Sequence, residues 1–271
     1  MKLAIPYRIS VPLVLCALVI IIVLMLFLIR QDDPRLADAD NSYRRGEEAK
    51  TISDRKVAFN ESLQIYQELE KEYHPNFGSG RLYYNIGNTY FQLEEYPWAI
   101  FNYLRAQKLM PRNEKVISNL GIAQEKLSIE KTNNKSTAFS KVFFFYTYLS
   151  LPERLQVFFL FSLLAFVLTS AVLWFSNSWL KRAMWISLLL LGISVLSLAY
   201  SQYFEPVRAV LVQASDLYRD GGTEYAKVGE APLEAGTEVE VISSLPNGKW
   251  LKIVTPKGDP GFVPGETIRI L

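Results

Sequence analysis

The sequence predicts a multidomain membrane protein that combines an α-helical repeat region, three membrane-spanning helices and a small C-terminal all-β domain. Three observations indicate this class. Apolar residues recur with helical spacing over residues 36–131, three long apolar runs interrupt the chain, and the pattern changes to period two after Pro206. Half of the 271 residues are hydrophobic, in keeping with several membrane segments.

The charge and the few reactive side chains exclude several function classes. A net charge of +2, without a long run of Lys or Arg, argues against nucleic acid as a partner. Cys16 is the single cysteine and His74 the single histidine, so the sequence offers no disulfide and no Cys/His zinc cluster. His74 lies between two helical patterns, where we expect a solvated loop residue. We therefore expect a non-enzymatic protein with no catalytic residue, no metal and no cofactor.

The strongest motif runs from Gly80 to Pro111 and is typical of two antiparallel helices packed closely together. Small residues stand where the helices approach each other, aromatic residues stand where the seam must be filled, and a proline ends the second helix. The residues at these structural positions are Tyr83, Gly87, Tyr90, Ala99, Tyr103, Ala106 and Pro111. In this spacing they resemble the tetratricopeptide repeat over residues 80–113. The resemblance implies a docking surface without built-in chemistry.

Incomplete copies of the motif flank this repeat. Residues 114–131 repeat its first half, with Leu120 and Gly121 placed 34 residues after Ile86 and Gly87, and we expect a capping helix there. On the other side, helical patterns over 39–50 and 57–71 form a second pair, but the stretch between them is too long for the motif. The repeat domain, residues 36–131, therefore contains about two and a half repeats, near the minimum for a stable stack.

The resemblance also implies a peptide-binding groove lined by the first helix of each repeat. The matching positions are Arg81, Tyr84, Asn88, Phe91, Lys115, Ser118 and Ile122. Some members of the family hold a C-terminal carboxylate; Asn85 and Lys115 match that pattern, but Asn119 stands where an arginine is expected. The alternative for Tyr84 and Phe91 is that they only pack the stack.

Three apolar runs have the length of membrane spans: residues 11–29, 155–175 and 183–204. Lys2 and Arg8 precede the first, and the turn at 176–182 carries Lys181 and Arg182. By the positive-inside rule, residues 1–10 and this turn are cytoplasmic, whereas residues 30–154 and 205–271 lie outside the cytoplasm. Two alternatives remain, namely a cleaved signal peptide for the first run and buried helices of a soluble domain for all three.

Two further features accompany the spans. Hydroxyl residues recur every seven positions, which places them on one face of each helix and suits close packing in lipid. They are Ser162, Thr169 and, directly after the second span, Ser176, and in the third span Ser187, Ser194 and Ser201. Upstream, residues 139–154 are rich in aromatic side chains, and we expect this segment at the membrane surface.

Residues 206–271 show alternating apolar residues separated by turn residues, which predicts about five short strands in a small barrel. The segments Leu217-Tyr-Arg-Asp-Gly, Trp250-Leu-Lys-Ile and Gly261-Phe-Val-Pro resemble the bacterial SH3 domain. Asp220 departs from the first of those motifs, so the usual peptide groove is expected to be altered. The residues that represent these SH3-like motifs are Tyr218, Trp250, Phe262 and Pro264. Trp250 is either a core residue or a stacking platform.

In its order of domains the chain resembles the BatE-type proteins of the Bacteroides aerotolerance operon. The resemblance implies a scaffold in the bacterial cytoplasmic membrane, with repeat and SH3-like domains in the periplasm. It also implies other envelope or membrane proteins as partners, among them von Willebrand A domain proteins and a MoxR-type ATPase. The competing hypothesis is a cell-wall module that binds peptidoglycan peptides and recruits a hydrolase. Because a membrane hairpin separates the two domains in the sequence, we expect them to be independent modules.

Overall fold

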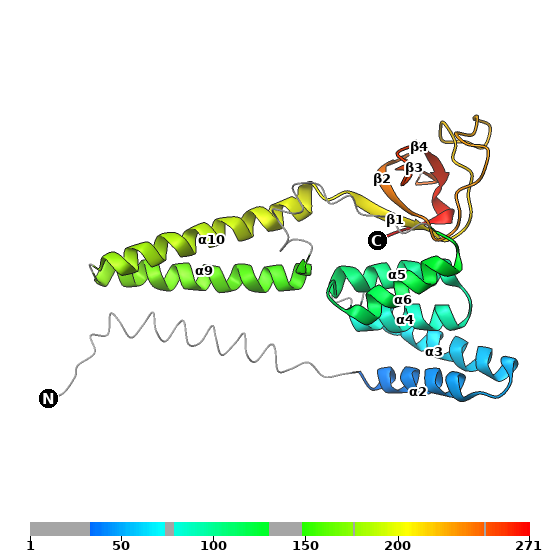
Figure 1. Ribbon diagram of the computed structural model, residues 1–271, viewed down its shortest axis with the longest axis horizontal. Coiled ribbons are helices and arrows are strands. Elements are labelled where there is room, and N and C mark those ends of the chain that lie inside the picture. The colour runs from blue at the N-terminus through cyan, green and yellow to red at the C-terminus, as the bar shows by residue number, and fades with distance from the viewer. Residues whose placement is uncertain (1–32, 74–78, 130–147, 176, 247) are drawn as a thin grey trace.

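The computed structural model describes residues 33–73, 79–129, 148–175, 177–246 and 248–271. Within these residues the chain forms a helical stack, a long helical hairpin and an antiparallel sheet, and the stack and the sheet lie at the same end of the hairpin (Figure 1). The predicted first span (11–29), Cys16, His74 and residues 139–147 of the predicted aromatic segment lie outside the described residues.

The stack consists of two helix pairs and one further helix. The elements are α2 (Pro34–Glu48), α3 (Ile52–Tyr73), α4 (Gly80–Gln92), α5 (Tyr96–Leu109) and α6 (Glu114–Lys126). Asn113 caps α6 by accepting hydrogen bonds from the backbone of Lys115 and Val116. The second pair turns at Glu94, whose φ of 66° lies in the left-handed region.

The first helix pair is tighter than the sequence predicted. Its helices were expected at 39–50 and 57–71 with a long link, whereas only residues 49–51 separate α2 from α3. The helices start earlier than predicted, because a polar residue caps each of them several residues before its apolar pattern begins. Asp33 accepts a hydrogen bond from the Arg35 backbone ahead of α2, and Thr51 accepts one from the Asp54 backbone ahead of α3.

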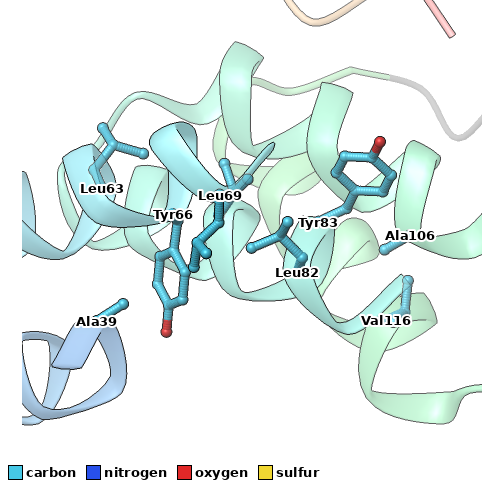
Figure 2. Packing of buried hydrophobic residues seen from close by; sticks show 9 residues of the cluster. Ala39, Leu63, Tyr66, Leu69, Leu82, Tyr83, Ala106 and Val116 are labelled. Carbon is cyan, nitrogen blue, oxygen red and sulfur yellow. The ribbon is translucent and has the colours of Figure 1, made fainter. Parts of the chain in front are cut away.

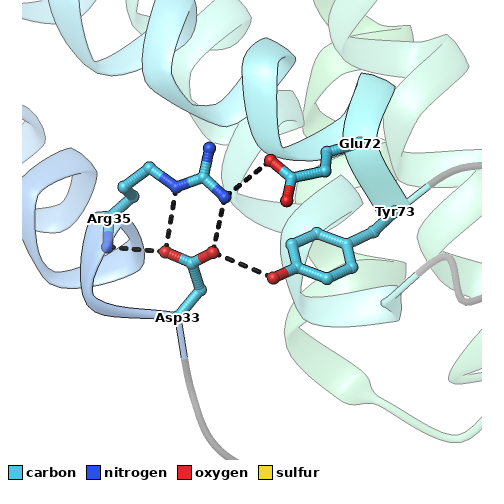
Figure 3. Close-up of polar contacts among 4 residues, drawn as sticks. All are labelled: Asp33, Arg35, Glu72 and Tyr73. Atoms are coloured by element: carbon cyan, nitrogen blue, oxygen red, sulfur yellow. Dashed lines mark hydrogen bonds and ion pairs between the residues drawn. The ribbon is translucent and has the colours of Figure 1, made fainter.

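A cluster of polar side chains connects the beginning of α2 with the end of α3 through hydrogen bonds (Figure 3). The Asp33 carboxylate accepts hydrogen bonds from Arg35 Nη2 at 2.6 Å and from the Tyr73 hydroxyl at 2.9 Å. Arg35 Nη2 also donates to Glu72 at 2.7 Å. The hydrogen bonds from Arg35 are the main reason that the pKa of Asp33 lies well below its usual range. The cluster closes the first pair at its open end.

One apolar cluster joins all five helices of the stack (Figure 2). Tyr66 of α3 and Ile86 of α4 are 2% and 1% exposed, and Ala39, Ala106 and Val116 bring α2, α5 and α6 into the same cluster. Burial of apolar area stabilises such a cluster by about 25 cal/mol per Å². The helices therefore form one body rather than separate pairs.

The hairpin consists of α9 (Leu151–Trp174) and α10 (Ser178–Tyr203). A capping box between Ser150 and Glu153 begins α9, four residues before the predicted apolar run. Both helices are long and apolar enough to cross a membrane, and only 6% and 17% of their most apolar windows are buried. This exposure favours membrane association over the alternative for these two runs, namely buried core helices of a soluble domain.

Small residues lie between the two hairpin helices, but the predicted stripe is only partly correct. Ser187 and Ser194 of α10 are buried as predicted, together with Ser197. On α9, Thr169 is exposed and Ala165 is buried instead. The seven-residue spacing drifts relative to a straight helix of 3.6 residues per turn, so a stripe drawn at that spacing leaves the interface.

The C-terminal sheet has five antiparallel strands in the order β4-β3-β2-β1-β5. They are β1 (Val207–Leu211), β2 (Glu238–Ser244), β3 (Trp250–Val254), β4 (Pro260–Pro264) and β5 (Ile268–Ile270), with a 3-10 turn, η1 (Gly265–Thr267), before the last. Alternate residues such as Leu251, Ile253 and Val263 form the core. The short strand β5, which pairs with β1, had no clear signal in the sequence.

Candidate functional site

The first helices of the stack, α2, α4 and α6, are joined in a row by polar side chains. The Asn85 amide of α4 donates to Asp40 of α2 at 3.3 Å. On the other side of α4, Asn88 accepts a hydrogen bond from the Asn119 amide of α6 at 2.9 Å. We call the surface carried by these three helices the first-helix face, and the predicted groove residues all lie on α4 or α6 of this face.

Four of the seven predicted groove residues are exposed on the first-helix face. These are Arg81, Lys115, Ser118 and Ile122. Ile122 is 43% exposed, and its neighbour Ile117 is 46% exposed. The face therefore offers cationic and aliphatic side chains to a partner, and these are the residues able to contact one.

The other three, Tyr84, Asn88 and Phe91, are half-buried and already have partners within the stack. The Tyr84 ring lies 6.0 Å from that of Tyr103, and Phe91 packs edge-on against Tyr96 at 5.3 Å between ring centroids. Asn88 accepts a hydrogen bond from the Tyr103 hydroxyl at 2.8 Å. For the two aromatic residues, the alternative role in packing is the one that these contacts favour.

Of the three positions compared with a carboxylate clamp, the two amides, Asn85 and Asn119, are engaged within the stack, whereas Lys115 is exposed. The Asn119 amide donates to the Tyr84 hydroxyl at 3.2 Å as well as to Asn88. Asn85 donates to the Tyr66 hydroxyl at 3.3 Å in addition to Asp40. These amides satisfy groups inside the stack, so the face differs from a carboxylate-binding surface. In the sequence, this difference was indicated by Asn119, which stands where a carboxylate clamp has an arginine.

The structural repeat residues lie between α4 and α5. A Cβ atom added to Gly87 would come within 2.7 Å of the Tyr103 ring. Ala99 and Ala106 are fully buried, and Tyr90 stacks on Trp98 at 5.8 Å. Tyr83, which is 5% exposed, lies under the guanidinium of Arg105 at 3.8 Å. Pro111 follows the end of α5.

Residues 80–113 match the family of the tetratricopeptide repeat. This chain contains a tetratricopeptide repeat. The match covers the α4/α5 pair and the turn that follows it. A comparison with curated proteins finds no match to the chain. The tetratricopeptide repeat is a protein-interaction module, so the helical stack is the part of the chain for which a protein partner is indicated.

Two buried tyrosines of the helical stack, Tyr66 and Tyr103, have raised pKa values. Burial raises the pKa of Tyr66, and the hydrogen bond to Asp40 raises it further. Burial likewise raises the pKa of Tyr103, which is 1% exposed. Both phenols are held protonated as hydrogen-bond donors. In the part of the chain that the structure describes, no cluster of three or more His, Cys, Asp or Glu side chains could hold a metal ion.

The four residues marked on the C-terminal sheet come together at one place. Tyr218 exchanges backbone hydrogen bonds with Phe262 of β4, and its ring lies edge-on against Trp250 of β3 at 5.4 Å. Pro264 is the register partner of Trp250. All four are half-buried, and Lys252 Nζ lies 5.8 Å from the Phe262 ring centroid. Trp250 therefore lies outside the sheet core, where a stacking partner can reach part of it.

The sheet and the tetratricopeptide stack share a core, which corrects the expectation of independent modules. Val210 of β1 is fully buried in the same cluster as Ile100 and Leu104 of α5. On β5, the guanidinium of Arg269 lies 5.3 Å from the Trp98 ring centroid. The two regions are far apart in the sequence, but α10 runs back along α9, so the sheet that follows α10 lies at the same end of the hairpin as the stack (Figure 1).

A glycine in the turn before β2 fits closely against the stack. Gly236 has a φ of 90°, which favours glycine, and a Cβ there would lie 2.7 Å from Ile129 and 3.0 Å from Ile100. The sheet and the turn before β2 thus contact α5 and the residues that follow α6, whereas the first-helix face carries exposed side chains. Sequence reasoning missed this interface because no local pattern marks it.

Proposed function

We propose that the protein is a non-enzymatic, membrane-anchored scaffold that binds a protein segment on the first-helix face of its tetratricopeptide stack. The observation that carries the proposal is the asymmetry of the stack. The sheet covers α5 through Val210 and Arg269, while Arg81, Lys115 and Ile122 are exposed on the first helices. An uncovered face with cationic and aliphatic side chains is suited to docking a partner.

The hairpin supplies the membrane anchor in this proposal. Trp174 and Trp179 flank the turn between α9 and α10, and Lys181 and Arg182 follow it, as at a cytoplasmic membrane surface. The stack and the sheet lie at the opposite end of the hairpin, so one orientation places both outside the cytoplasm (Figure 1). We extend the proposal to an envelope complex of the BatE type, with membrane proteins as partners.

Site-directed crosslinking and affinity recovery from native membranes test the first-helix face. We choose Arg81→Ala, Lys115→Ala and Ile122→Ala together, because these side chains are exposed and their truncation spares the packing of Tyr84 and Phe91. The loss of a few interface contacts worth about 1 kcal/mol each should reduce partner recovery by tenfold or more.

The matched control removes two cations and one aliphatic side chain from the second helices, with Lys56→Ala, Val57→Ala and Lys108→Ala. These residues are also exposed, on α3 and α5. Helicity and expression should stay normal for both triple variants, and the control should retain its partners. Full partner recovery by the first-helix variant would contradict the proposed docking face.

A second candidate function is cell-wall binding by the sheet, which the SH3-like motifs suggest. The half-exposed cluster of Tyr218, Trp250 and Phe262 is the specific observation in its favour, since aromatic faces can stack on a peptide. Retention of the full-length protein on purified sacculi, lost on Trp250→Ala and kept in the first-helix variant, would support it. Absence of retention would favour the scaffold alone.

A further inference from the structure

A cavity of about 220 Å³ lies between α9 and α10, near the end of the hairpin that faces the stack and the sheet. Its walls have two kinds of chemistry. Val157, Phe161, Leu190 and Ile193 form an apolar part, whereas Arg154 and Ser197 supply polar groups. The cavity is partly open to the surroundings of the hairpin, so a ligand can enter it from outside.

Arg154 places a cation at one end of the cavity. It lies in the first turn of α9 and is only 8% exposed, and its Nη2 atom donates to the Ser201 hydroxyl at 3.4 Å. Ser201 in turn donates to Glu205 at 3.2 Å. A guanidinium at a helix N-terminus, where the helix dipole is also positive, is suited to an anionic oxygen such as that of a phosphate.

Ser197 is the second and independent indication. The side chain is 4% exposed and lines the cavity, and its Oγ atom has no hydrogen-bond partner among the described residues. Two serines on the same helix, Ser187 and Ser194, instead donate to backbone carbonyls of α10. A buried hydroxyl without a partner is unfavourable, and a hydrogen bond to an occupant would remove this cost.

The apolar lining of the cavity favours an anion that also carries a hydrocarbon chain. A dry apolar cavity of about 150 Å³ binds benzene in another protein, so 220 Å³ accommodates a segment of hydrocarbon chain. An inorganic ion would leave the walls of Phe161 and Ile193 without contacts. A ligand with a phosphate and an alkyl chain satisfies both ends, and a bilayer surrounding the hairpin would provide one.

We propose that this cavity binds one phospholipid, with its phosphate on Arg154 and Ser197 and an acyl chain between Phe161 and Ile193. The inference rests on the membrane anchoring proposed above. A bound lipid would fix the two hairpin helices relative to each other at the end that carries the stack. The Glu153 carboxylate in the same turn as Arg154 forms an ion pair with Arg112, so the packing of this end extends into the stack.

Native mass spectrometry of the full-length protein in a mild detergent tests the proposal. We expect one dioleoylphosphatidylglycerol per chain, bound at least tenfold more tightly than dioleoylglycerol, which lacks the phosphate. Arg154→Gln should weaken phosphatidylglycerol binding about tenfold or more, and Ser197→Leu should abolish it by filling the cavity. Inorganic phosphate at millimolar concentration should not displace the lipid.

Matched controls separate the cavity from general effects of charge and size. Arg182→Gln removes an exposed cation from the other end of α10, and Gly192→Leu adds a leucine where nothing lies within 4 Å. Both should bind the lipid like the unaltered protein. If Arg154→Gln loses helicity, Ser197→Leu still decides the question.

The outcomes are distinguishable from a failure of the scaffold proposal. Equal affinity of Ser197→Leu and Gly192→Leu for the phospholipid would overturn the inference, as would displacement of the lipid by inorganic phosphate. A chain that fractionates with membranes but retains no lipid would contradict the cavity alone. A chain that does not fractionate with membranes would contradict the anchoring itself.

Discussion

The α4/α5 pair and the α9/α10 pair are both helix pairs joined by a short turn, yet they differ in what they bury. Between α4 and α5 the large buried side chains are mainly apolar, among them Ile86 at 1% and Ile100 at 0% exposure, and Thr89 and Asn102 are the buried polar residues. Between α9 and α10 the buried set includes three serines, and large aliphatic side chains such as Leu189, at 65% exposure, point outward. The first pair has the composition of helices that pack in water, whereas the second has the composition expected of helices in lipid, where the hydrophobic effect does not drive helices together.

The two pairs also use glycine differently. Gly87 stands where a Cβ would meet the Tyr103 ring at 2.7 Å, whereas nothing lies within 4 Å of a Cβ at Gly192. Close approach of the helix backbones therefore depends on glycine in the tetratricopeptide pair but not at that position of the hairpin. A residue type that looks equivalent in the sequence has a packing role in one pair only.

The largest expected effect comes from removing buried apolar volume. Ile100→Ala deletes a fully buried side chain from the cluster shared by α5 and β1, and we expect a loss of about 2–5 kcal/mol in the free energy of unfolding. Because the cluster is shared, the stack and the sheet should both loosen. Urea unfolding in detergent, followed by near-ultraviolet circular dichroism, measures the change.

The paired control is Leu189→Ala in α10. This side chain is 65% exposed, so its truncation should change the free energy of unfolding by about 0.5 kcal/mol or less. If Ile100→Ala and Leu189→Ala lowered the free energy of unfolding by similar amounts, the hairpin would bury its aliphatic residues as the stack does. The proposed difference between the two helix pairs would then be wrong.

A smaller effect follows from filling the glycine positions. Gly87→Leu forces the Tyr103 ring to move and should cost about 1–3 kcal/mol through overpacking, measured by the midpoint of thermal unfolding. Gly192→Leu should leave that midpoint nearly unchanged. A midpoint unaffected by Gly87→Leu would show that α4 and α5 are less closely packed than their distances indicate.

The sequence predicted the elements whose signal is local. The tetratricopeptide motif and the strands of the sheet follow from spacing and turn chemistry, which a short segment carries by itself. The shared core of Ile100 and Val210 could not be predicted in this way, because its residues are about a hundred positions apart and no periodicity links them. The same limit applies to the cavity between α9 and α10, whose residues look like ordinary span residues.

The candidate site was predicted in part for a related reason. Positions such as Lys115 and Ile122 were found from the family pattern and are exposed on the first-helix face. Tyr84 and Phe91 fit the same pattern but turn toward Tyr103 and Tyr96. A pattern fixes the face of a helix on which a residue lies, but the size of its neighbours decides whether the side chain reaches solvent.

The smallest expected effect concerns alkaline pH and again separates the two pairs. The pKa of Tyr66 is raised by burial and by its hydrogen bond to Asp40, so the folded stack holds this phenolic proton more tightly than the unfolded chain does. That contribution to stability is fully present below about pH 10, the pKa of an unperturbed tyrosine, and is lost as the pH rises above it. Burial gives Tyr103 the same dependence.

We therefore expect near-ultraviolet circular dichroism of the stack to change above pH 10, while the helical signal of the hairpin persists. Tyr66→Phe should cost about 1 kcal/mol at neutral pH, because the hydroxyl no longer donates to Asp40. The same variant should lose less stability than the unaltered protein between pH 10 and pH 11.5, since one of the phenols with a raised pKa is gone. An identical alkaline loss in both proteins would show that the Tyr66 hydroxyl does not carry the effect, and Tyr103→Phe would then be the variant in which the loss should diminish.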